Sequence, residues 1–96
     1  MAERNLERRC YHFYGSVQGV GFRYRARYAA ELYGLTGWVE NLDDGSVVLE
    51  AQGPAEELNK LVHAILNQSR WIVVEHVDVT TLPLRAEERG FSTRGW

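Results

Sequence analysis

The first strongly patterned stretch of the chain alternates like a β-strand. From about Glu7 to Tyr14, one face carries Tyr11 and Phe13, and the other carries Cys10, His12 and Tyr14. Because aromatic side chains occur on both faces, we expect a strand in the interior of a sheet. The preceding residues 1–6 are mostly polar, and we expect them to form an N-terminal lead-in.

Two later segments repeat apolar residues every three or four positions, which is typical of amphipathic helices. The first runs from Phe22 to Tyr33, and Gly34 after it suits a left-handed cap; its apolar stripe is Phe22, Ala26, Ala29, Ala30 and Tyr33. The second opens at Gly53-Pro54 and ends over residues 67–70, and its stripe is Leu58, Leu61, Val62 and Ile65. Proline at the first helical position is a common start signal, so we place Pro54 there.

The remaining patterned segments indicate strands. They are Leu35–Glu40, Ser46–Gln52 and Trp71–Thr81, with a short closing strand at Phe91–Arg94 after a charged loop over residues 84–90. Asp44-Gly45, in the turn that joins the second and third strands, is a strong hairpin signal. The resulting βαββαβ order predicts an α+β protein with the ferredoxin-like split βαβ fold, in which an antiparallel sheet carries two helices on one face.

Length and charge narrow the classes of function. The 96 residues predict a single domain, 1–96, with one modest core. A net charge of −2, from 11 basic and 13 acidic residues, gives no general attraction to nucleic acid or membrane, so we expect neither as a partner. Cys10 is the only cysteine, which fits a reducing cytoplasm, and no apolar run is long enough to span a bilayer. We therefore expect a cytoplasmic location.

A glycine-rich segment lies between the first strand and the first helix. It consists of Gly15, Ser16, Val17, Gln18, Gly19, Val20, Gly21, Phe22 and Arg23. Backbone N–H groups of such a loop can converge on an anion, and Arg23 would add a fork of donors suited to phosphate. The segment has neither the GxGxxG spacing nor the GK[ST] ending of nucleotide-binding loops, and by itself it also fits a tight connection without a ligand. Arg25 and Arg27 on the following helix are expected to be solvated surface.

Other catalytic devices are not indicated. His12, His63 and His76 have no metal-ligand spacing, so we expect no metal and no cofactor. Ser16 has no histidine near it in sequence, and covalent catalysis is not supported. Asn41 stands at a strand end before a turn, and its position alone favours a local turn role.

Two motifs change that interpretation of Asn41. Gly15-x-Val17-Gln18-Gly19-Val20-x-Phe22-Arg23 resembles the first signature of the acylphosphatase family, and Gly37-Trp38-Val39-x-Asn41, continuing to Gly45, Val47 and Gly53, resembles the second. The resemblance extends from about Tyr11 to Thr81 and implies the same ferredoxin-like fold. It also implies that Arg23 binds the phosphoryl group of an acyl phosphate and that Asn41 orients the attacking water. Inorganic phosphate would then be the product and a competitive inhibitor, and the protein a monomer.

The sequence departs from the family pattern at a few positions. Ser16 stands where the family often has a basic residue, Phe13 where it has an aliphatic one, and Glu40 where it has a basic or neutral one. An acid beside Asn41 would weaken anion binding unless strand alternation turns Glu40 to the other face. The tail from Phe91 to Trp96 is less apolar than a closing strand of the family.

Two alternatives stay open at this point. The same fold without turnover would make a phosphate-binding or regulatory module, although such a module needs no residue that orients water. RNA-recognition domains share the element order, but they stack bases on aromatic residues of the sheet. The third predicted strand has no aromatic residue and carries Glu50, so this alternative ranks last.

Overall fold

The computed structural model describes residues 5–67 and 69–95, and residues 1–4 of the predicted lead-in lie outside that part. Leu6 already belongs to the first strand. The elements in chain order are β1 (Leu6–Ser16), α1 (Phe22–Leu32), β2 (Thr36–Asn41), β3 (Val47–Pro54), α2 (Ala55–Asn67), β4 (Val73–Leu82) and β5 (Phe91–Arg94). The predicted element order is therefore confirmed, with a fifth strand at the C-terminal end.

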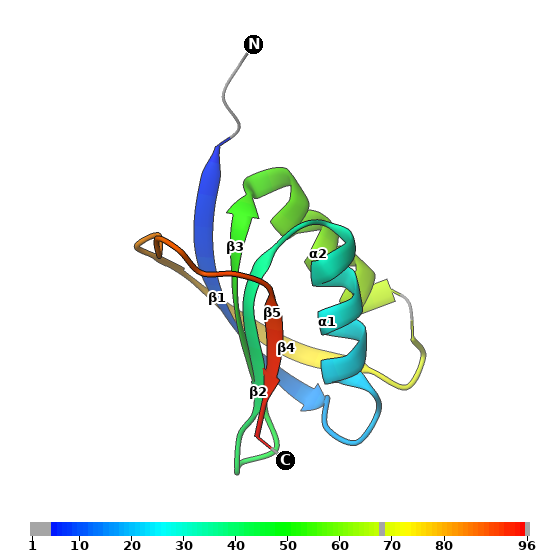
Figure 1. Ribbon diagram of the computed structural model, residues 1–96. Coiled ribbons are helices and arrows are strands. Elements are labelled where there is room, and N and C mark those ends of the chain that lie inside the picture. Colours follow the sequence, from blue (N-terminus) through cyan, green and yellow to red (C-terminus); the bar gives the residue numbers. More distant parts are fainter. Residues whose placement is uncertain (1–4, 68, 96) are drawn as a thin grey trace.

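The sheet has the strand order β4-β1-β3-β2-β5, and both helices cover one of its faces (Figure 1). The pairings among β1 to β4 are antiparallel, as predicted for the ferredoxin-like fold. The pairing of β5 with β2 is parallel, so the sheet is mixed rather than purely antiparallel. The reason is the path of the chain: residues 83–90 cross from the end of β4 to the start of β2, where Phe91 pairs with Gly37. β5 must then run in the same direction as β2.

The core lies between the sheet and the two helices. Burial of the predicted stripe of α1 is confirmed for Phe22, Ala26, Ala29 and Ala30, and that of α2 for Leu58, Leu61 and Ile65. From the sheet, Tyr11, Phe13, Val39, Val47 and Leu49 pack against them. Phe13 is fully buried and meets Phe22 edge-on, with 5.0 Å between ring centroids. The aromatic departure at position 13 is therefore accommodated in the core, directly beside the start of α1.

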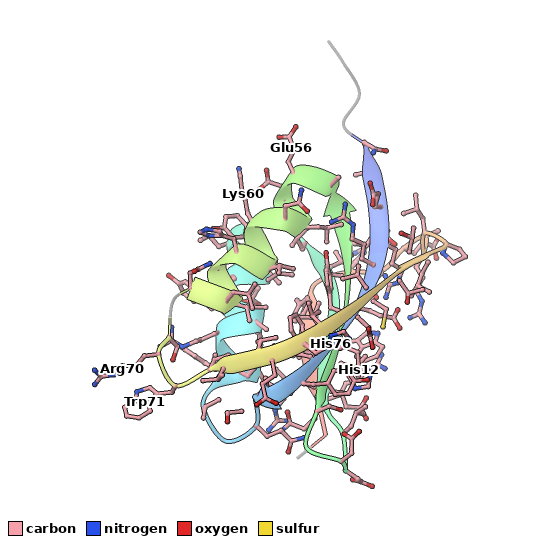
Figure 2. All side chains as sticks on the ribbon, turned by 180° about the vertical axis from the view of Figure 1, so that it is seen from behind. His12, Glu56, Lys60, Arg70, Trp71 and His76 are labelled. Atoms are coloured by element: carbon pink, nitrogen blue, oxygen red, sulfur yellow. The ribbon has the colours of Figure 1, made fainter. Side chains whose placement is uncertain are left out.

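Three predicted boundaries are wrong. β1 continues through Gly15 to Ser16, two residues beyond the predicted end at Tyr14. Pro54 is the last residue of β3, where it pairs with Leu6, and α2 begins at Ala55. β4 begins at Val73, because Arg70 and Trp71 still belong to the turn after α2, where Trp71 is exposed and stacks with Arg70 (Figure 2). The corrections at Pro54 and Val73 concern local backbone details away from the glycine-rich segment, whereas the longer β1 includes the first two residues of that segment.

The charged loop over residues 84–90 covers part of the helix-free face of the sheet. Beneath it, the side chain of Arg8 is 1% exposed. Its Nη1 and Nη2 donate to the two carboxylate oxygens of Glu88 at 2.8 and 3.1 Å, and its Nε donates to Glu50 Oε1 at 3.0 Å. The hydrogen bonds to Arg8 lower the pKa of Glu88 below its ordinary value. Arg8 thus fastens the loop to the sheet.

No helix within the described residues is long and apolar enough to cross a membrane. These residues pack around one hydrophobic cluster, which extends from Tyr11 to Phe91. The assignment of the whole chain, 1–96, to a single domain stays a prediction.

Candidate active site

The glycine-rich segment turns sharply between β1 and α1. At Gly15, φ is 130°, and a Cβ atom there would lie 2.3 Å from the carbonyl oxygen of Val73 in β4. Gly21 precedes α1 with φ 81°, in the left-handed region that favours glycine. Position 15 therefore requires glycine for close strand packing, whereas position 21 favours it for the entry into the helix.

The amide groups of this segment are left without protein partners. α1 has no side-chain cap at its N-terminus. Within the described residues, none of the backbone N–H groups from Val17 to Tyr24 donates to a backbone or side-chain acceptor. Unpaired N–H groups at a helix N-terminus favour an anion, because both the donors and the helix dipole point toward it. The segment has the properties of an anion cradle.

The side chain of Gln18 turns away from this cradle toward the β2–β3 turn. Its Nε2 donates to the carbonyl oxygens of Leu42 and Ser46 at 2.6 and 2.8 Å. Ser46 is itself buried, and its N–H and hydroxyl groups donate to Asp44. Gln18 therefore fastens the glycine-rich segment to the turn that follows Asn41.

Arg23 lies in the first turn of α1 and is half-buried. Its Nη1 donates to the carbonyl oxygen of Arg94 at 2.9 Å, and this is the one hydrogen bond of its guanidinium among the described residues. A guanidinium has five N–H donors. Most of those of Arg23 are therefore free to contact an anion beside the loop.

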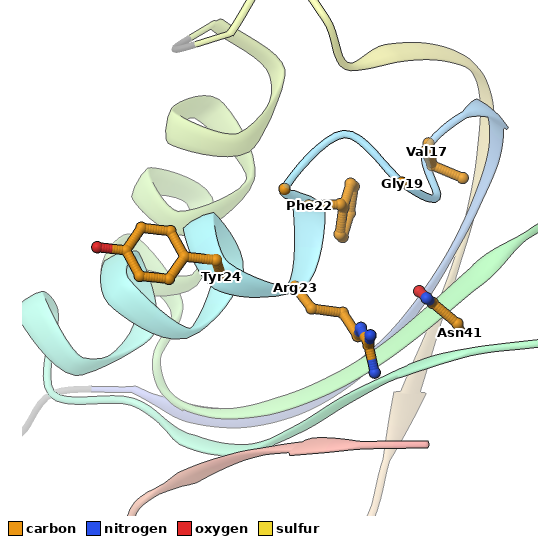
Figure 3. Close-up of a pocket in the computed structure, with 7 residues that line it drawn as sticks. Val17, Gly19, Phe22, Arg23, Tyr24 and Asn41 are labelled. Atoms are coloured by element: carbon orange, nitrogen blue, oxygen red, sulfur yellow. The ribbon is translucent and has the colours of Figure 1, made fainter. Parts of the chain in front are cut away.

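Asn41, the last residue of β2, faces Arg23 across a pocket of about 210 Å³ (Figure 3). Its Oδ1 atom is buried without a hydrogen-bond partner, a property shared only with Trp38 Nε1 among the buried side-chain polar atoms in the described part of the chain. A buried, unpaired amide oxygen is costly unless something donates to it. This atom is suited to accept a hydrogen bond from a molecule in the pocket.

The pocket is lined by Val17, Gly19, Gly21, Phe22, Arg23, Tyr24 and Asn41. Of the other predicted residues, Gly15 and Ser16 lie outside its lining because they still pair with β4. Gln18 is directed to the β2–β3 turn, and Val20 packs partly against the core. Tyr24 was not predicted; the signal that could have revealed it is its place off the core stripe of α1, directly after Arg23.

Glu40 does not face the pocket. Neighbouring residues of a strand point to opposite sides of the sheet. Val39 is fully buried on the helix side, which puts Asn41 on that side and Glu40 on the other, at the register position of Arg94. Glu40 is therefore outside the lining of the pocket, as strand alternation predicts, although its side chain lies beside Gly95 at the sheet edge: a Cβ atom on Gly95 would be 3.9 Å from Glu40 Cγ and 3.8 Å from Arg23 Nη1.

The histidines and the cysteine lie elsewhere. His12 and His76 are on the helix-free face of the sheet (Figure 2), where His12 stacks on Tyr14 and bonds to Ser46 Oγ, and His76 bonds to Asp78. Burial raises the pKa of Cys10, which disfavours its thiolate form. No group of three or more metal-ligating side chains occurs in the described part of the chain.

Comparisons with known proteins identify the family of the chain. The sequence profile of the acylphosphatase family matches residues 10–93. An acylphosphatase of Bifidobacterium longum (strain NCC 2705) is 44% identical over 91 residues, which cover 94% of each chain. The crystal structure of acylphosphatase from Bacillus subtilis superposes with a TM-score of 0.83 at 37% identity, over 95% of this chain and all of that one. An acylphosphatase structure from Coxiella burnetii gives 0.85 at 30% identity, over 98% of this chain and all of that one. The chain belongs to the acylphosphatase family of enzymes, whose substrates are small molecules that contain phosphate.

Proposed function

We propose that the protein hydrolyses the carboxyl–phosphate bond of acyl phosphates, with Arg23 and Asn41 as its catalytic residues. The observation that carries the proposal is the set of unpaired polar groups around one pocket. They are the amide groups of Val17–Tyr24, most of the Arg23 guanidinium and the buried Oδ1 of Asn41. Donors for an anion and an acceptor for a water molecule thus lie on the same cavity.

In this proposal the cradle holds the phosphoryl group. Its oxygens accept hydrogen bonds from the amide groups of the segment and from Arg23. These donors are fixed by the backbone and by the Arg23–Arg94 contact, so they need little reorganisation when charge develops on the phosphoryl oxygens.

Asn41 orients the nucleophile. A water molecule that donates a hydrogen bond to Asn41 Oδ1 directs a lone pair toward phosphorus. Its oxygen forms the new bond, the carboxylate leaves with the electron pair of the broken P–O bond, and the water's proton passes to a phosphate oxygen. An amide is too weak a base to take that proton, so the role of Asn41 is positioning by direct contact with the nucleophile.

The leaving group limits the substrate class. The carboxylate of an acyl phosphate is a good leaving group and needs no strong general acid. A phosphate monoester releases a poor alkoxide, and none of the residues that line the pocket is a carboxylic acid or a histidine. We therefore propose acyl phosphates, rather than monoesters, as substrates.

Further properties follow as proposals. Inorganic phosphate is both product and competitive inhibitor, because it fills the same cradle. The reaction uses no metal and no cofactor, and the protein acts as a monomer. The single cysteine is compatible with a cytoplasmic location.

The test is hydrolysis of benzoyl phosphate in the presence of a chelator and of ¹⁸O-labelled water. We expect turnover, with the label in inorganic phosphate, because water attacks phosphorus. Label in benzoate would mean attack at the carbonyl carbon and would contradict the role of Asn41. A protein that binds phosphate without turnover would be a non-catalytic binding module, and the proposed function would be wrong.

A further inference from the structure

A second pocket adjoins the candidate active site. It has a volume of about 370 Å³ and is lined by Arg23, Tyr24, Arg27, Thr93 and Gly95. It shares Arg23 and Tyr24 with the first pocket, so the two cavities meet at the start of α1. The other wall comes from the C-terminal end of the chain, where Arg94 accepts a hydrogen bond from Arg23.

The in-line geometry of phosphoryl transfer indicates that the acyl group lies toward this second pocket. In phosphoryl transfer the attacking and leaving oxygens are roughly in line through phosphorus. Figure 3 shows Asn41 and Tyr24 on opposite sides of Arg23. If water is held at Asn41 and the phosphoryl group at Arg23, the acyl group extends toward Tyr24, and the second pocket begins there.

The lining of this pocket is cationic. It contains the guanidinium groups of Arg23 and Arg27, the Tyr24 ring and the Thr93 hydroxyl, and no carboxylate of the described residues is part of it. Arg23 and Arg27 are four positions apart on α1, so their side chains are neighbours on the same helix face, with Cβ atoms about 5–6 Å apart. Tyr24 is 74% exposed and offers an uncovered ring surface.

Arg27 is only weakly engaged within the protein. Its Nε lies 3.4 Å from Glu31 Oε2, and both side chains are about half exposed. An exposed ion pair of this length contributes little, so it competes poorly with a ligand anion. Arg27 is therefore a cation one helical turn from the proposed cradle, and most of its donors have no partner among the residues that the structure describes.

On this basis we propose that the second pocket binds the acyl group, and that Arg27 gives the enzyme a preference for acyl phosphates with a second anionic group. The inference rests on the proposed function and adds the substrate class. A carboxylate or phosphate on the acyl chain, about one helical turn from the reacting phosphorus, pairs with Arg27 while Arg23 holds the phosphoryl group. Tyr24 covers the part of the acyl group between the two charges.

Arg25 provides a matched control. It lies on the same helix, between Arg23 and Arg27, but it lines neither pocket. Arg25→Gln and Arg27→Gln remove the same charge from α1 by the same chemical change. If net charge alone attracts anionic substrates, both variants should bind them equally less well. If Arg27 makes a local contact, only Arg27→Gln should bind them less well.

The experiment compares 3-carboxybenzoyl phosphate with its neutral counterpart, 3-carbamoylbenzoyl phosphate, in the wild-type protein and both variants. The measured quantity is the ratio of the two kcat/KM values. We expect Arg27→Gln to lower this ratio by about two- to fivefold, mainly through KM, because an exposed ion pair binds substrate and transition state alike. Arg25→Gln should leave it unchanged, and added salt should reduce the difference. A third substrate, 3-phosphonobenzoyl phosphate, distinguishes the anion: a larger loss with it than with the carboxylate identifies phosphate-bearing acyl groups.

Failure of this inference is distinguishable from failure of the proposed function. If all three proteins hydrolyse 3-carbamoylbenzoyl phosphate but the ratio is the same in each, the acyl-subsite role of Arg27 is wrong and the hydrolase activity stands. If the ratio of kcat/KM values falls equally in Arg25→Gln and Arg27→Gln, the acyl-subsite role of Arg27 is also wrong. If the wild-type protein hydrolyses neither substrate, the proposed function fails, and the subsite with it.

Discussion

Two arginines at opposite ends of the sheet show how the same side chain is used in different ways. Arg8, near the start of β1, is buried, and its guanidinium donates to Glu88, Glu50 and Gln52. Arg23, beyond the end of β1, is half-buried in a pocket wall and, within residues 5–67 and 69–95, donates to a single carbonyl oxygen. The first arginine lies in a closed site, where protein carboxylates neutralise its charge. The second lies in an open site, where its donors are left for a ligand.

From this contrast we expect Arg8 to stabilise the fold, and Arg23 to act on substrate as proposed. Around Arg8 the partners are two carboxylates and the Gln52 amide oxygen, and burial excludes an external anion. The pocket beside Arg23 has unpaired amide donors and the Asn41 oxygen, and no carboxylate of the described residues belongs to its lining. Substitutions at the two sites should therefore separate, one reducing stability and the other activity.

Arg23→Ala is the substitution with the largest expected effect on activity. It removes the cationic donor from the phosphoryl group, and loss of one such donor lowers the rate by about 10²–10³-fold. Its single protein hydrogen bond contributes only about 1 kcal/mol, so the free energy of unfolding should change little. Steady-state kinetics with benzoyl phosphate and urea unfolding measure the two quantities. Activity within tenfold of the wild type would contradict the proposed role of Arg23 in holding the phosphoryl group.

Arg8→Met should lower the free energy of unfolding and leave the activity of the folded protein nearly unchanged. It leaves the partly buried carboxylates of Glu50 and Glu88 without their cation, which costs about 3 kcal/mol. The kcat of the folded variant should stay within about twofold of the wild type. Urea unfolding tests the first expectation. As a control, the triple variant with Glu50→Gln and Glu88→Gln should recover part of the loss, because no unpaired charge is left in the site. A stable but inactive Arg8→Met protein would contradict the account.

Glu88→Gln tests the stabilising role of the Arg8–Glu88 pair through the pH dependence of the free energy of unfolding. The hydrogen bonds from Arg8 lower the folded-state pKa of Glu88 below its ordinary value of 4.5. Because this pKa is lowered, ionised Glu88 contributes fully to the free energy of unfolding above pH 4.5, and the contribution is lost as pH falls through the folded-state pKa. At neutral pH the variant should be less stable by about 1–3 kcal/mol, and the two proteins should converge in acid. A difference that stays constant from neutral to strongly acidic pH would contradict this assignment.

Ser16→Lys has the smallest expected effect. Ser16 is exposed and directly precedes the pocket residue Val17, so lysine would add a cation at the rim of the open site. We expect the inhibition constant of inorganic phosphate to fall by about two- to threefold at low salt and to return to the wild-type value at high salt. A matched change on the far side of the sheet, Thr80→Lys, should leave that constant unchanged.

Local pattern was enough to predict most of the fold. The stripe that begins at Phe22 predicted α1, because helix period and burial are local properties. The glycines at 15, 19 and 21 predicted the turn into that helix, and all three have positive φ. Asn41 was predicted at a strand end, and it is the last residue of β2. Its proposed role came from the family motif, since position alone favoured a turn residue.

Contacts between distant segments could not be predicted in this way. Arg8 and Glu88 are 80 residues apart, and nothing near either residue indicates that they meet. The two bonds of Gln18 to the β2–β3 turn depend equally on tertiary packing, and so does the contact of Arg23 with Arg94. The parallel pairing of β5 follows from the route of residues 83–90 across the sheet, which no local period encodes.

The roles of Asn41 and Arg23 are separated by comparing kcat for benzoyl phosphate with the inhibition constant of inorganic phosphate in Asn41→Ala. The claim is that Arg23 and the loop amides hold the anion, whereas the unpaired oxygen of Asn41 orients water. We expect a fall in kcat of about 10²-fold with an inhibition constant within about twofold of the wild type. An unchanged kcat, or an inhibition constant that rises as far as kcat falls, would contradict it.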